Sequence, residues 1–196
     1  MSVAATVAAL ALGLAAARTS LSRGGALGRL LQLLIAVPWA VPGTVFAISL
    51  AAAFSVDAPA VGRFVLVGTP WILPMAYLVR SLPLTGRGAL AGLAQLDRSL
   101  EEAAAILGAG RWRILRRVTV PMLKPALAAA ASLTFITAMG DFVTSIILYT
   151  YDTRPISIEI LSSLRLQDTG VAAVYGVLLM TLSAVAFLLW GREERV

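Results

Sequence analysis

The sequence contains no cysteine and no histidine. Without cysteine the chain can form neither a disulfide framework nor a thiolate metal site, and it has no thiol nucleophile. Without histidine it lacks the commonest metal ligand and the base of a Ser-His-Asp triad. The single lysine, Lys124, follows Leu123 rather than the glycine-rich loop that a phosphate-binding lysine requires. The sequence therefore has no nucleotide-binding loop of that type.

Charged residues are scarce as well. Asp, Glu, Lys and Arg make up 13% of the 196 residues, about half of the roughly 25% that is usual in a soluble domain. Hydrophobic residues make up 59%, against roughly 45–50% in such domains. A chain of this length has too small an interior to bury so much apolar surface. We therefore expect lipid to be the solvent for most of it.

Apolar runs of membrane-spanning length recur along the chain. A spanning helix needs about 20 mainly apolar residues, with a range of roughly 17–25. The third run contains Pro70 and Pro74 and is slightly short for a span. We predict one all-α transmembrane domain over residues 1–196, a polytopic helix bundle of about five spans. The predicted spans are residues 1–17, 30–54, 64–79, 125–150 and 170–190.

The first apolar run has a second interpretation. Ala15-Ala16-Ala17 resembles the small-residue cleavage site of a signal peptide. A signal peptide also begins with basic residues, and no Lys or Arg precedes Arg18. The composition therefore favours a span, and whether residues 1–17 cross the bilayer completely stays open at this point.

The positions of the cations predict the orientation of the chain. Short cytoplasmic loops carry an excess of Lys and Arg. Alternate connections between the predicted spans hold 13 of the 16 Lys and Arg residues, and the others hold only Arg63, Arg154 and Arg165. This partition predicts an N-terminus outside and a C-terminus inside. The net charge of +6 then needs no nucleic acid to explain it.

Residues 80–124 form the one long connection, which this orientation places in the cytoplasm. A long loop with a helical pattern is unusual in a bundle and is typically functional. Ser99 followed three residues later by Glu102 is a capping-box pattern, which predicts a helix with Ser99 as its N-cap and Glu102 reaching back. We expect Gly108 and Gly110 to end or turn this helix.

The predicted loop helix has one apolar face, formed by Leu100, Ala103, Ala104 and Leu107. This face is shallow because two of its members are alanines, and another protein's backbone can approach such a face closely. A helix that lies on the membrane without a protein partner is the alternative. The following stretch, Arg111–Arg117, contains four arginines and a tryptophan and favours an interfacial position near anionic headgroups.

Asp141 is the one acid well inside a predicted span. At about 1.5 Å per residue it lies about 13 Å from the outer end of that span. A carboxylate at this depth costs about 2.5–3.5 kcal/mol, so we expect it to face the bundle interior or water. It either lines a translocation path or is held structurally by Thr137, Thr144 or Ser145 nearby.

Prolines interrupt the predicted spans at Pro38, Pro42, Pro70 and Pro74. Each proline removes a backbone hydrogen bond that lipid cannot replace, so it persists where neighbouring helices or a water-lined cavity satisfy the freed carbonyl. Such a kink serves either packing or the path. As path residues we consider, as a hypothesis, Asp141, Pro42, Thr137 and Thr144.

The loop contains a long spaced motif. Glu102-Ala103-Ala104 is followed by three residues, Gly108, nine residues and Val118-Thr119-Val120-Pro121. This pattern resembles the EAA loop of the permease subunits of binding-protein-dependent type I ABC importers, with two valines in place of isoleucine and leucine. Two further elements resemble the same family: Pro42-Gly43-Thr44-Val45, and Gly140-Asp141-Phe142-Val143-Thr144, which is similar to the iron, polyamine and sulfate branches.

The resemblance implies a transport subunit that is not itself an enzyme. The EAA loop would form a coupling helix in a cleft of a cytoplasmic ABC ATPase dimer, and that partner would bind ATP-Mg and hydrolyse it, with no cofactor in this chain. Glu102 would contact the ATPase, Ala103 and Ala104 would form the close-packing face, Gly108 would permit the turn, and Pro121 would end the loop. The resemblance also implies a second permease half, an extracytoplasmic substrate-binding protein and a multi-pass position in a prokaryotic inner membrane.

The cargo is the least defined part of this prediction. The resemblance is greatest to the iron(III), polyamine and thiamine branches, which favours a small cationic solute such as ferric iron, and the chain could be the C-terminal half of a two-half permease. Two alternatives belong to other classes. One is an ATP-independent channel or ion-coupled carrier that uses Asp141, and the other is a half-permease remnant that transports nothing.

Overall fold

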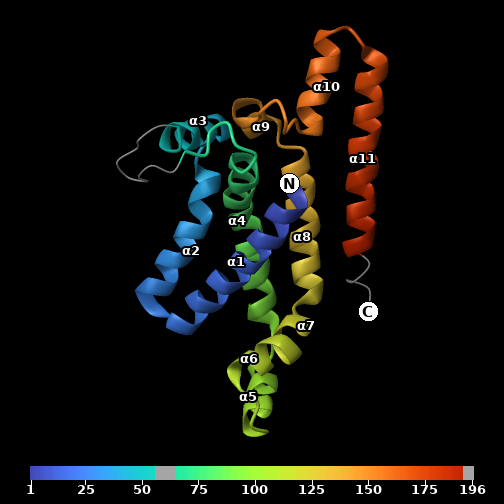
Figure 1. Ribbon diagram of the computed structural model, residues 1–196. Helices are drawn as coiled ribbons and strands as arrows, with labels where there is room; N and C mark the ends of the chain where they lie inside the picture. Colours follow the sequence, from blue (N-terminus) through green and yellow to red (C-terminus); the bar gives the residue numbers. More distant parts are fainter. Residues whose placement is uncertain (56–64, 192–196) are drawn as a thin grey trace.

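The computed structural model describes residues 1–55 and 65–191, and the regular secondary structure of this part is helical, apart from one isolated bridge between Thr150 and Thr153 (Figure 1). The prediction of an all-α fold is confirmed. The helices are α1 Ser2–Arg23, α2 Gly25–Ala40, α3 Gly43–Ala53, α4 Ile72–Gln95, α5 Arg98–Ile106, α6 Arg111–Ile114, the π-helix η1 Leu115–Thr119, α7 Val120–Met122, α8 Lys124–Met139, α9 Phe142–Leu148, α10 Ile156–Arg165 and α11 Thr169–Gly191.

Five long helices form the body of the molecule. Figure 1 shows α1, α2, α4, α8 and α11 running up and down in alternation. The short helices α5, α6 and α7 gather at one end, and α3 and α9 lie at the other. The N-terminus lies toward the α3–α9 end, and α11 runs toward the α5 end. The predicted topology, with the N-terminus outside and the loop of residues 80–124 inside, requires the N-terminus and α5 to lie at opposite ends. The orientation in a membrane stays a prediction.

The second predicted span is broken. Instead of one helix over residues 30–54, α2 and α3 meet at an angle of 103°. Val41 precedes a proline and is extended, with φ −93° and ψ 128°, because the proline ring disfavours a helical conformation there. Pro42 then serves as the N-cap of α3. The proline that the sequence marked as a kink therefore turns the chain through a right angle.

The third predicted span, residues 64–79, differs most from the structure. Its first residue lies outside the described part of the chain, and α4 begins only at Ile72 and continues to Gln95, well into the predicted loop. Arg80 and Arg87, which we assigned to that loop, are therefore helix residues. Assigning Arg80 to the loop was wrong because a single cation does not end an apolar helix when an acid from another part of the bundle pairs with it.

Two of the described helices, α1 and α11, are long and apolar enough to cross a membrane by themselves. Two bent pairs, α2 with α3 and the α6–α7 segment with α8, raise this number to four. The predicted number of about five also counts the third apolar run, part of which lies in α4. The helix α4 carries two arginines and is not among the helices that are apolar enough to span. The helix α1 packs inside the bundle, where Ala5, Ala9 and Ala17 are buried.

Small residues allow the central helices to approach closely. At Gly13 of α1, an added Cβ would lie 2.6 Å from the Thr85 hydroxyl oxygen and 2.9 Å from the Gly86 nitrogen of α4. At Gly88, on α4, an added Cβ would lie 2.7 Å from the Cβ atom of Ala130 on α8. Helix pairs in membranes pack in this way, with backbones in near contact. α4 is therefore the centre of the bundle, between α1 and α8.

Candidate translocation site and coupling loop

Asp141 lies at a break in the fourth predicted span. Residues 125–150 were expected to form one helix, but α8 ends at Met139 and α9 begins at Phe142. Asp141 is the N-cap of α9, and its Oδ1 accepts a hydrogen bond of 3.0 Å from the backbone N–H of Thr144. An aspartate at this position satisfies an N–H group that the first turn of a helix leaves unpaired. The acid therefore has a structural partner on its own element.

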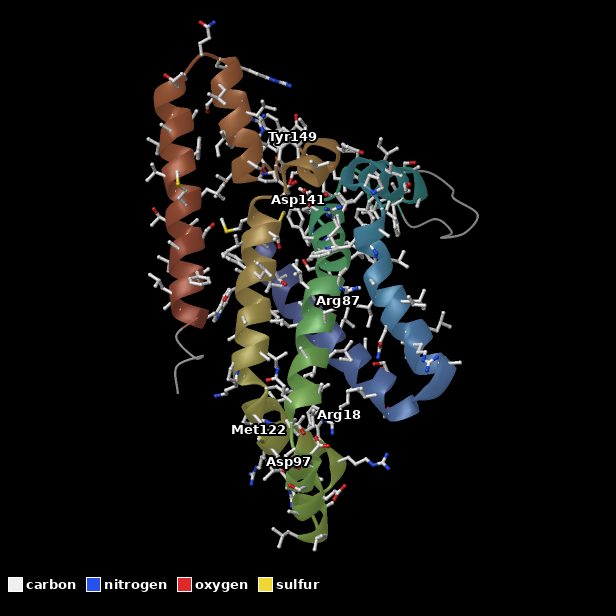
Figure 2. The ribbon with its side chains drawn as sticks, turned by 180° about the vertical axis from the view of Figure 1, so that it is seen from behind. Arg18, Arg87, Asp97, Met122, Asp141 and Tyr149 are labelled. Atoms are coloured by element: carbon white, nitrogen blue, oxygen red, sulfur yellow. The ribbon has the colours of Figure 1, made fainter. Side chains whose placement is uncertain are left out.

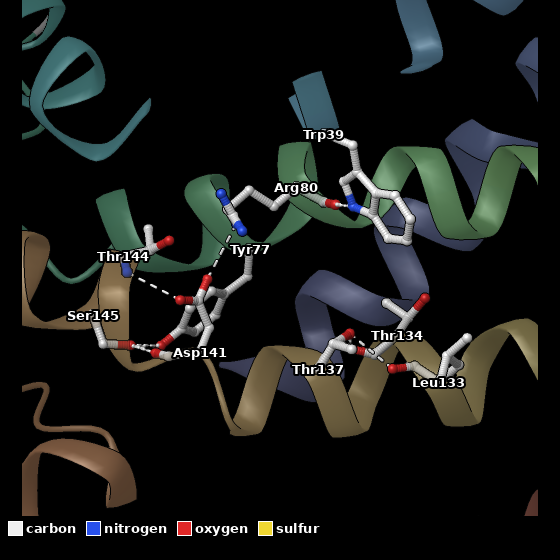
Figure 3. A network of polar contacts seen from close by, with 9 residues as sticks. All are labelled: Trp39, Tyr77, Arg80, Leu133, Thr134, Thr137, Asp141, Thr144 and Ser145. Atoms are coloured by element: carbon white, nitrogen blue, oxygen red, sulfur yellow. Dashed lines mark hydrogen bonds and ion pairs between the residues drawn. The ribbon is translucent and has the colours of Figure 1, made fainter. Parts of the chain in front are cut away.

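The other oxygen of Asp141 pairs with an arginine. Oδ2 lies 3.3 Å from Nε of Arg80, and the two side chains are 13% and 29% exposed (Figure 3). Our sequence reasoning missed this pair because the charge pattern placed Arg80 in a cytoplasmic loop. One signal could have found it: an acid inside a span needs a partner, and Arg80 directly follows the third apolar run.

Arg80 connects both broken spans to α4. Its carbonyl accepts a hydrogen bond of 3.2 Å from the indole N–H of Trp39, near the end of α2. Its guanidinium carbon lies 6.0 Å from the centre of the Phe46 ring on α3. Gly43, at the start of α3, leaves room for the guanidinium, because an added Cβ would lie 3.1 Å from Nη1. The two sequence elements that contain Pro42 and Asp141 therefore meet at one arginine.

Ser145 and Tyr77 extend this polar cluster. The Ser145 hydroxyl donates a hydrogen bond to the carbonyl of Asp141, and it lies 2.5 Å from the hydroxyl of Tyr77 on α4. Ser145 is completely buried and Tyr77 nearly so. The cluster fastens α9 to α4 at a second point and fixes the position of the α8–α9 break, as Figure 3 shows.

A cavity of about 330 Å³ opens beside the ion pair. Of the four predicted path residues, Asp141 and Thr137 line it and Thr144 and Pro42 do not. Thr144 is completely buried, and Pro42 lies exposed between α2 and α3. Thr137 donates its hydroxyl hydrogen within α8, where the Leu133 carbonyl lies at 2.8 Å. The lining consists of Trp39, Tyr77, Arg80, Ser81, Leu84, Thr137, Ala138, Gly140, Asp141, Phe142 and Val143.

The loop helix α5 begins differently from the predicted capping box. Asp97 is its N-cap, and the Asp97 carboxylate accepts a hydrogen bond of 2.9 Å from the Ser99 N–H. This hydrogen bond lowers the pKa of Asp97 below its usual value. Ser99 therefore lies inside the first turn, and the prediction that Ser99 caps the helix was wrong. Asp97 provides the same function two positions earlier.

The end of α5 is an exposed apolar tip. Ile106 and Leu107 are 86% and 87% exposed, and Trp112 on α6 is 72% exposed. Glu102 and Ala103 are exposed as well, and Gly108 turns the chain with a φ of +79°. A left-handed conformation of this kind favours glycine. Of the remaining motif residues, Ala104 is half-buried and Pro121 lies in the first turn of α7.

Glu101, the neighbour of the motif glutamate, has an internal role that the sequence did not reveal. Its carboxylate lies 3.4 Å from Arg18 at the end of α1 and accepts a hydrogen bond from the Thr119 hydroxyl of η1. These contacts hold α5 against the bundle. Figure 2 shows Arg18 and Asp97 near one end of the molecule and Asp141 toward the other, with Arg87 between them.

The described residues contain no group of three or more acids that could hold a metal ion. The structure combines two broken spans, a half-buried ion pair beside a cavity, and an exposed apolar tip of α5 at the far end. Together they define a polytopic helical membrane protein with a projecting loop. Residues 9–192 match the family described as "Binding-protein-dependent transport system inner membrane component", and the chain belongs to that family.

Relatives and solved structures agree with this family. The chain is 32% identical to the probable ABC transporter permease protein y4fN of Sinorhizobium fredii (strain NBRC 101917 / NGR234), over 96% of its own length and 34% of that protein. It is 36% identical to the ferric transport system permease protein FbpB of Actinobacillus pleuropneumoniae, over 82% of its length and 23% of that protein. The chain thus spans about a third or less of these relatives.

The fold itself has close counterparts. A chain of the MetNI methionine ABC transporter, in inward-facing conformations, superimposes with a TM-score of 0.78 at 19% identity, covering 100% of this chain and 90% of that one. A chain of a bacterial alginate ABC transporter in complex with its alginate-bound periplasmic protein gives 0.72 at 18% identity, over 97% and 72%. At these identities the similarity concerns the fold.

Proposed function

We propose that the chain is a permease subunit of an ATP-driven importer, which forms part of the translocation path and is coupled to a separate ATPase through α5. The exposed tip of α5 carries this proposal. Ile106 and Leu107 are almost fully exposed and lie where α5 ends, among residues that are themselves exposed or half-buried. Exposed apolar side chains rimmed by charged residues are typical of a protein interface. Figure 1 shows α5 at the opposite end of the molecule from α9, whose first residues line the cavity.

The motif residues fit this coupling role. Glu102 is exposed and available for an ion pair or hydrogen bond with the ATPase, while Glu101 is occupied by Arg18. Ala103 is exposed and small, so a partner backbone can approach it. Gly108 lets the chain leave the partner's cleft without strain. Pro121 begins the turn back into α8.

The family supports the partners of this proposal. They are a cytoplasmic ABC ATPase dimer that holds ATP-Mg, a second permease half and an extracytoplasmic substrate-binding protein. The second half is another copy or a different chain, and the relatives' greater length supports a larger two-half permease. The subunit crosses a prokaryotic inner membrane several times, with the N-terminus outside and α5 in the cytoplasm. The ferric transport relatives support an iron-containing cargo.

Coupling can be tested with charge reversal at the tip. Glu102→Arg and Gly108→Pro should leave the protein in the membrane but abolish ATP hydrolysis that depends on binding protein, measured in proteoliposomes with the ATPase and the second half. Arg29→Glu, a charge reversal of equal size on an exposed residue near the start of α2, is the control. Wild-type coupling in both tip variants would refute this role for α5.

The same preparation separates the alternatives. An ion-coupled carrier that uses Asp141 would transport without the ATPase and would be insensitive to Glu102→Arg. A non-transporting remnant would neither copurify with the ATPase nor stimulate it. The pairing of Asp141 with Arg80 also disfavours the carrier, since the acid is already compensated.

A further inference from the structure

The cavity beside the α8–α9 break contains one acid and one base. Asp141 and Arg80 are the only residues with formal charge among those that line it, and they pair with each other. The net charge of the wall is therefore zero. A bare cation would find no uncompensated carboxylate here. To bind Asp141, it would have to displace Arg80 and leave a guanidinium unpaired in a largely buried site, which is unfavourable.

The hydrogen-bonding capacity of the pair is unbalanced. Each oxygen of Asp141 already has a partner, Oδ1 with the Thr144 N–H and Oδ2 with Arg80 Nε. A guanidinium carries five N–H donors, and Nη1 of Arg80 is shielded from solvent and has no hydrogen-bond partner among the described residues. An unpaired buried donor on a charged group is costly. The site therefore has an unused donor on Arg80, which an acceptor atom of a ligand would satisfy, and no unused carboxylate oxygen for a cation.

We infer that Arg80 is the cargo-binding group of this cavity and that it binds an oxyanion, either as the cargo or as the ligand shell of a metal ion. This inference rests on the proposed transport function. Asp141 is then a positioning residue, which holds the guanidinium and compensates its charge while the site is empty. Arginine suits this role because its planar fork of donors matches the oxygens of a phosphate, sulfate or carboxylate.

The surroundings of Arg80 fit this assignment. Asp141 holds the guanidinium at Nε, and the Phe46 ring lies 6.0 Å from its carbon, so the guanidinium stays in place when Nη1 gains an acceptor. Gly43 contributes no side chain on that side, and an added Cβ would press against Nη1 at 3.1 Å. Trp39 lines the same cavity, and its indole N–H donates a hydrogen bond to the Arg80 carbonyl. The fluorescence of this indole should therefore respond to a ligand at Arg80.

Ligand binding can be followed by Trp39 fluorescence in the full chain in lipid nanodiscs. The other tryptophans, Trp71, Trp112 and Trp190, are replaced by Phe. Inorganic phosphate and sulfate are titrated at constant ionic strength, and Mg²⁺ and putrescine are the cationic probes. We expect a saturable response to the oxyanions. Arg80→Gln should weaken it about 10- to 100-fold, the loss of charge-assisted hydrogen bonds, and Arg80→Lys should retain part of it.

Two further variants make the test independent of folding. Arg87→Gln removes an arginine from the same helix but outside the cavity lining, and it should change nothing. Asp141→Asn frees the guanidinium from its competitor, so the affinity for phosphate should rise several-fold. If Asp141 instead bound a cation, the variants of the ion pair would change the Trp39 response in the opposite direction. Asp141→Asn would abolish a response to Mg²⁺ or putrescine, and Arg80→Gln would strengthen it.

The inference is overturned by that opposite pattern, or by wild-type protein that responds to none of the oxyanions. Its failure is distinct from failure of the proposed function. If α5 is not a coupling helix, the Glu102→Arg variant hydrolyses ATP normally while phosphate still binds. If only the inference fails, coupling is intact and the oxyanions have no effect on Trp39.

Discussion

Gly13 offers the sharpest test of the packing. It faces α4 from α1, and an added Cβ would lie 2.6 Å from the Thr85 hydroxyl oxygen, 2.9 Å from the Thr85 carbonyl carbon and 2.9 Å from the Gly86 nitrogen. Two of these three atoms belong to the backbone of a helix and cannot rotate away. Gly13→Ala therefore forces α1 and α4 apart along their contact, and the bundle loses packing on both sides of the new methyl group.

The magnitude follows from two opposing contributions. Overpacking a close-packed interface costs about 1–3 kcal/mol, and the rigid backbone here places Gly13→Ala at the upper end. Replacing glycine by alanine within a helix returns about 1 kcal/mol. The expected net loss is about 2 kcal/mol. Gly176→Ala in α11, where an added Cβ meets nothing within 4 Å, keeps only the gain.

The free energy of unfolding can be measured by denaturant titration of the purified protein in detergent, followed by far-UV circular dichroism. Gly13→Ala should unfold at lower denaturant than the wild type, and Gly176→Ala at the same or higher denaturant. The two substitutions are chemically identical, so the helix propensity cancels between them. Equal midpoints for both variants would refute the close approach of α1 and α4.

Three other predictions concern the polar contacts. Because the pKa of Asp97 is lowered in the folded protein, its capping contribution is complete above the usual value and is lost as the pH falls through the lowered one. The protection of the Ser99 amide against hydrogen exchange, relative to the intrinsic rate at each pH, should fall over that range and be low at every pH in Asp97→Ala. Arg18→Gln should release Glu101 and raise protease sensitivity of the loop without changing phosphate binding. Tyr77→Phe should destabilise the bundle by about 1 kcal/mol through one lost hydroxyl contact, measured by the same denaturant titration.

The sequence predicted the elements of the functional regions better than their boundaries. The E-A-A helix, the glycine turn and the interruption at Pro42 occur, because local composition determines helix breakers and turns. Pro38 and Pro74, by contrast, lie within α2 and in the first turn of α4. The predicted break at Pro42 became a right-angled turn, and the break at Gly140 was not predicted. A glycine followed by an aspartate reads as span interior when its neighbours are apolar, although the aspartate can cap a new helix.

The ion pair could not be derived from local pattern. The positive-inside rule assigns a cation beside an apolar run to the cytoplasm. Arg80 departs from this rule because a distant residue, Asp141, compensates it inside the bundle. Such a pair is visible only once α4 and α9 are placed side by side.

The capping error has a simpler cause: Asp97 and Ser99 are both good N-caps, and the end of α4 at Gln95 decides between them.

The structure joins the cavity to the tip through one rigid element. α4 carries Arg80 near its first turns and ends at Gln95, two residues before the cap of α5. These two positions are about 22 Å apart at 1.5 Å per residue, and α4 packs against α1 and α8 along this length through small residues. α1 is tied to α5 as well, through Arg18 and Glu101. Under the proposed coupling, a displacement of α5 would therefore reach the guanidinium as a movement of whole helices, because close-packed backbones leave little room to absorb it.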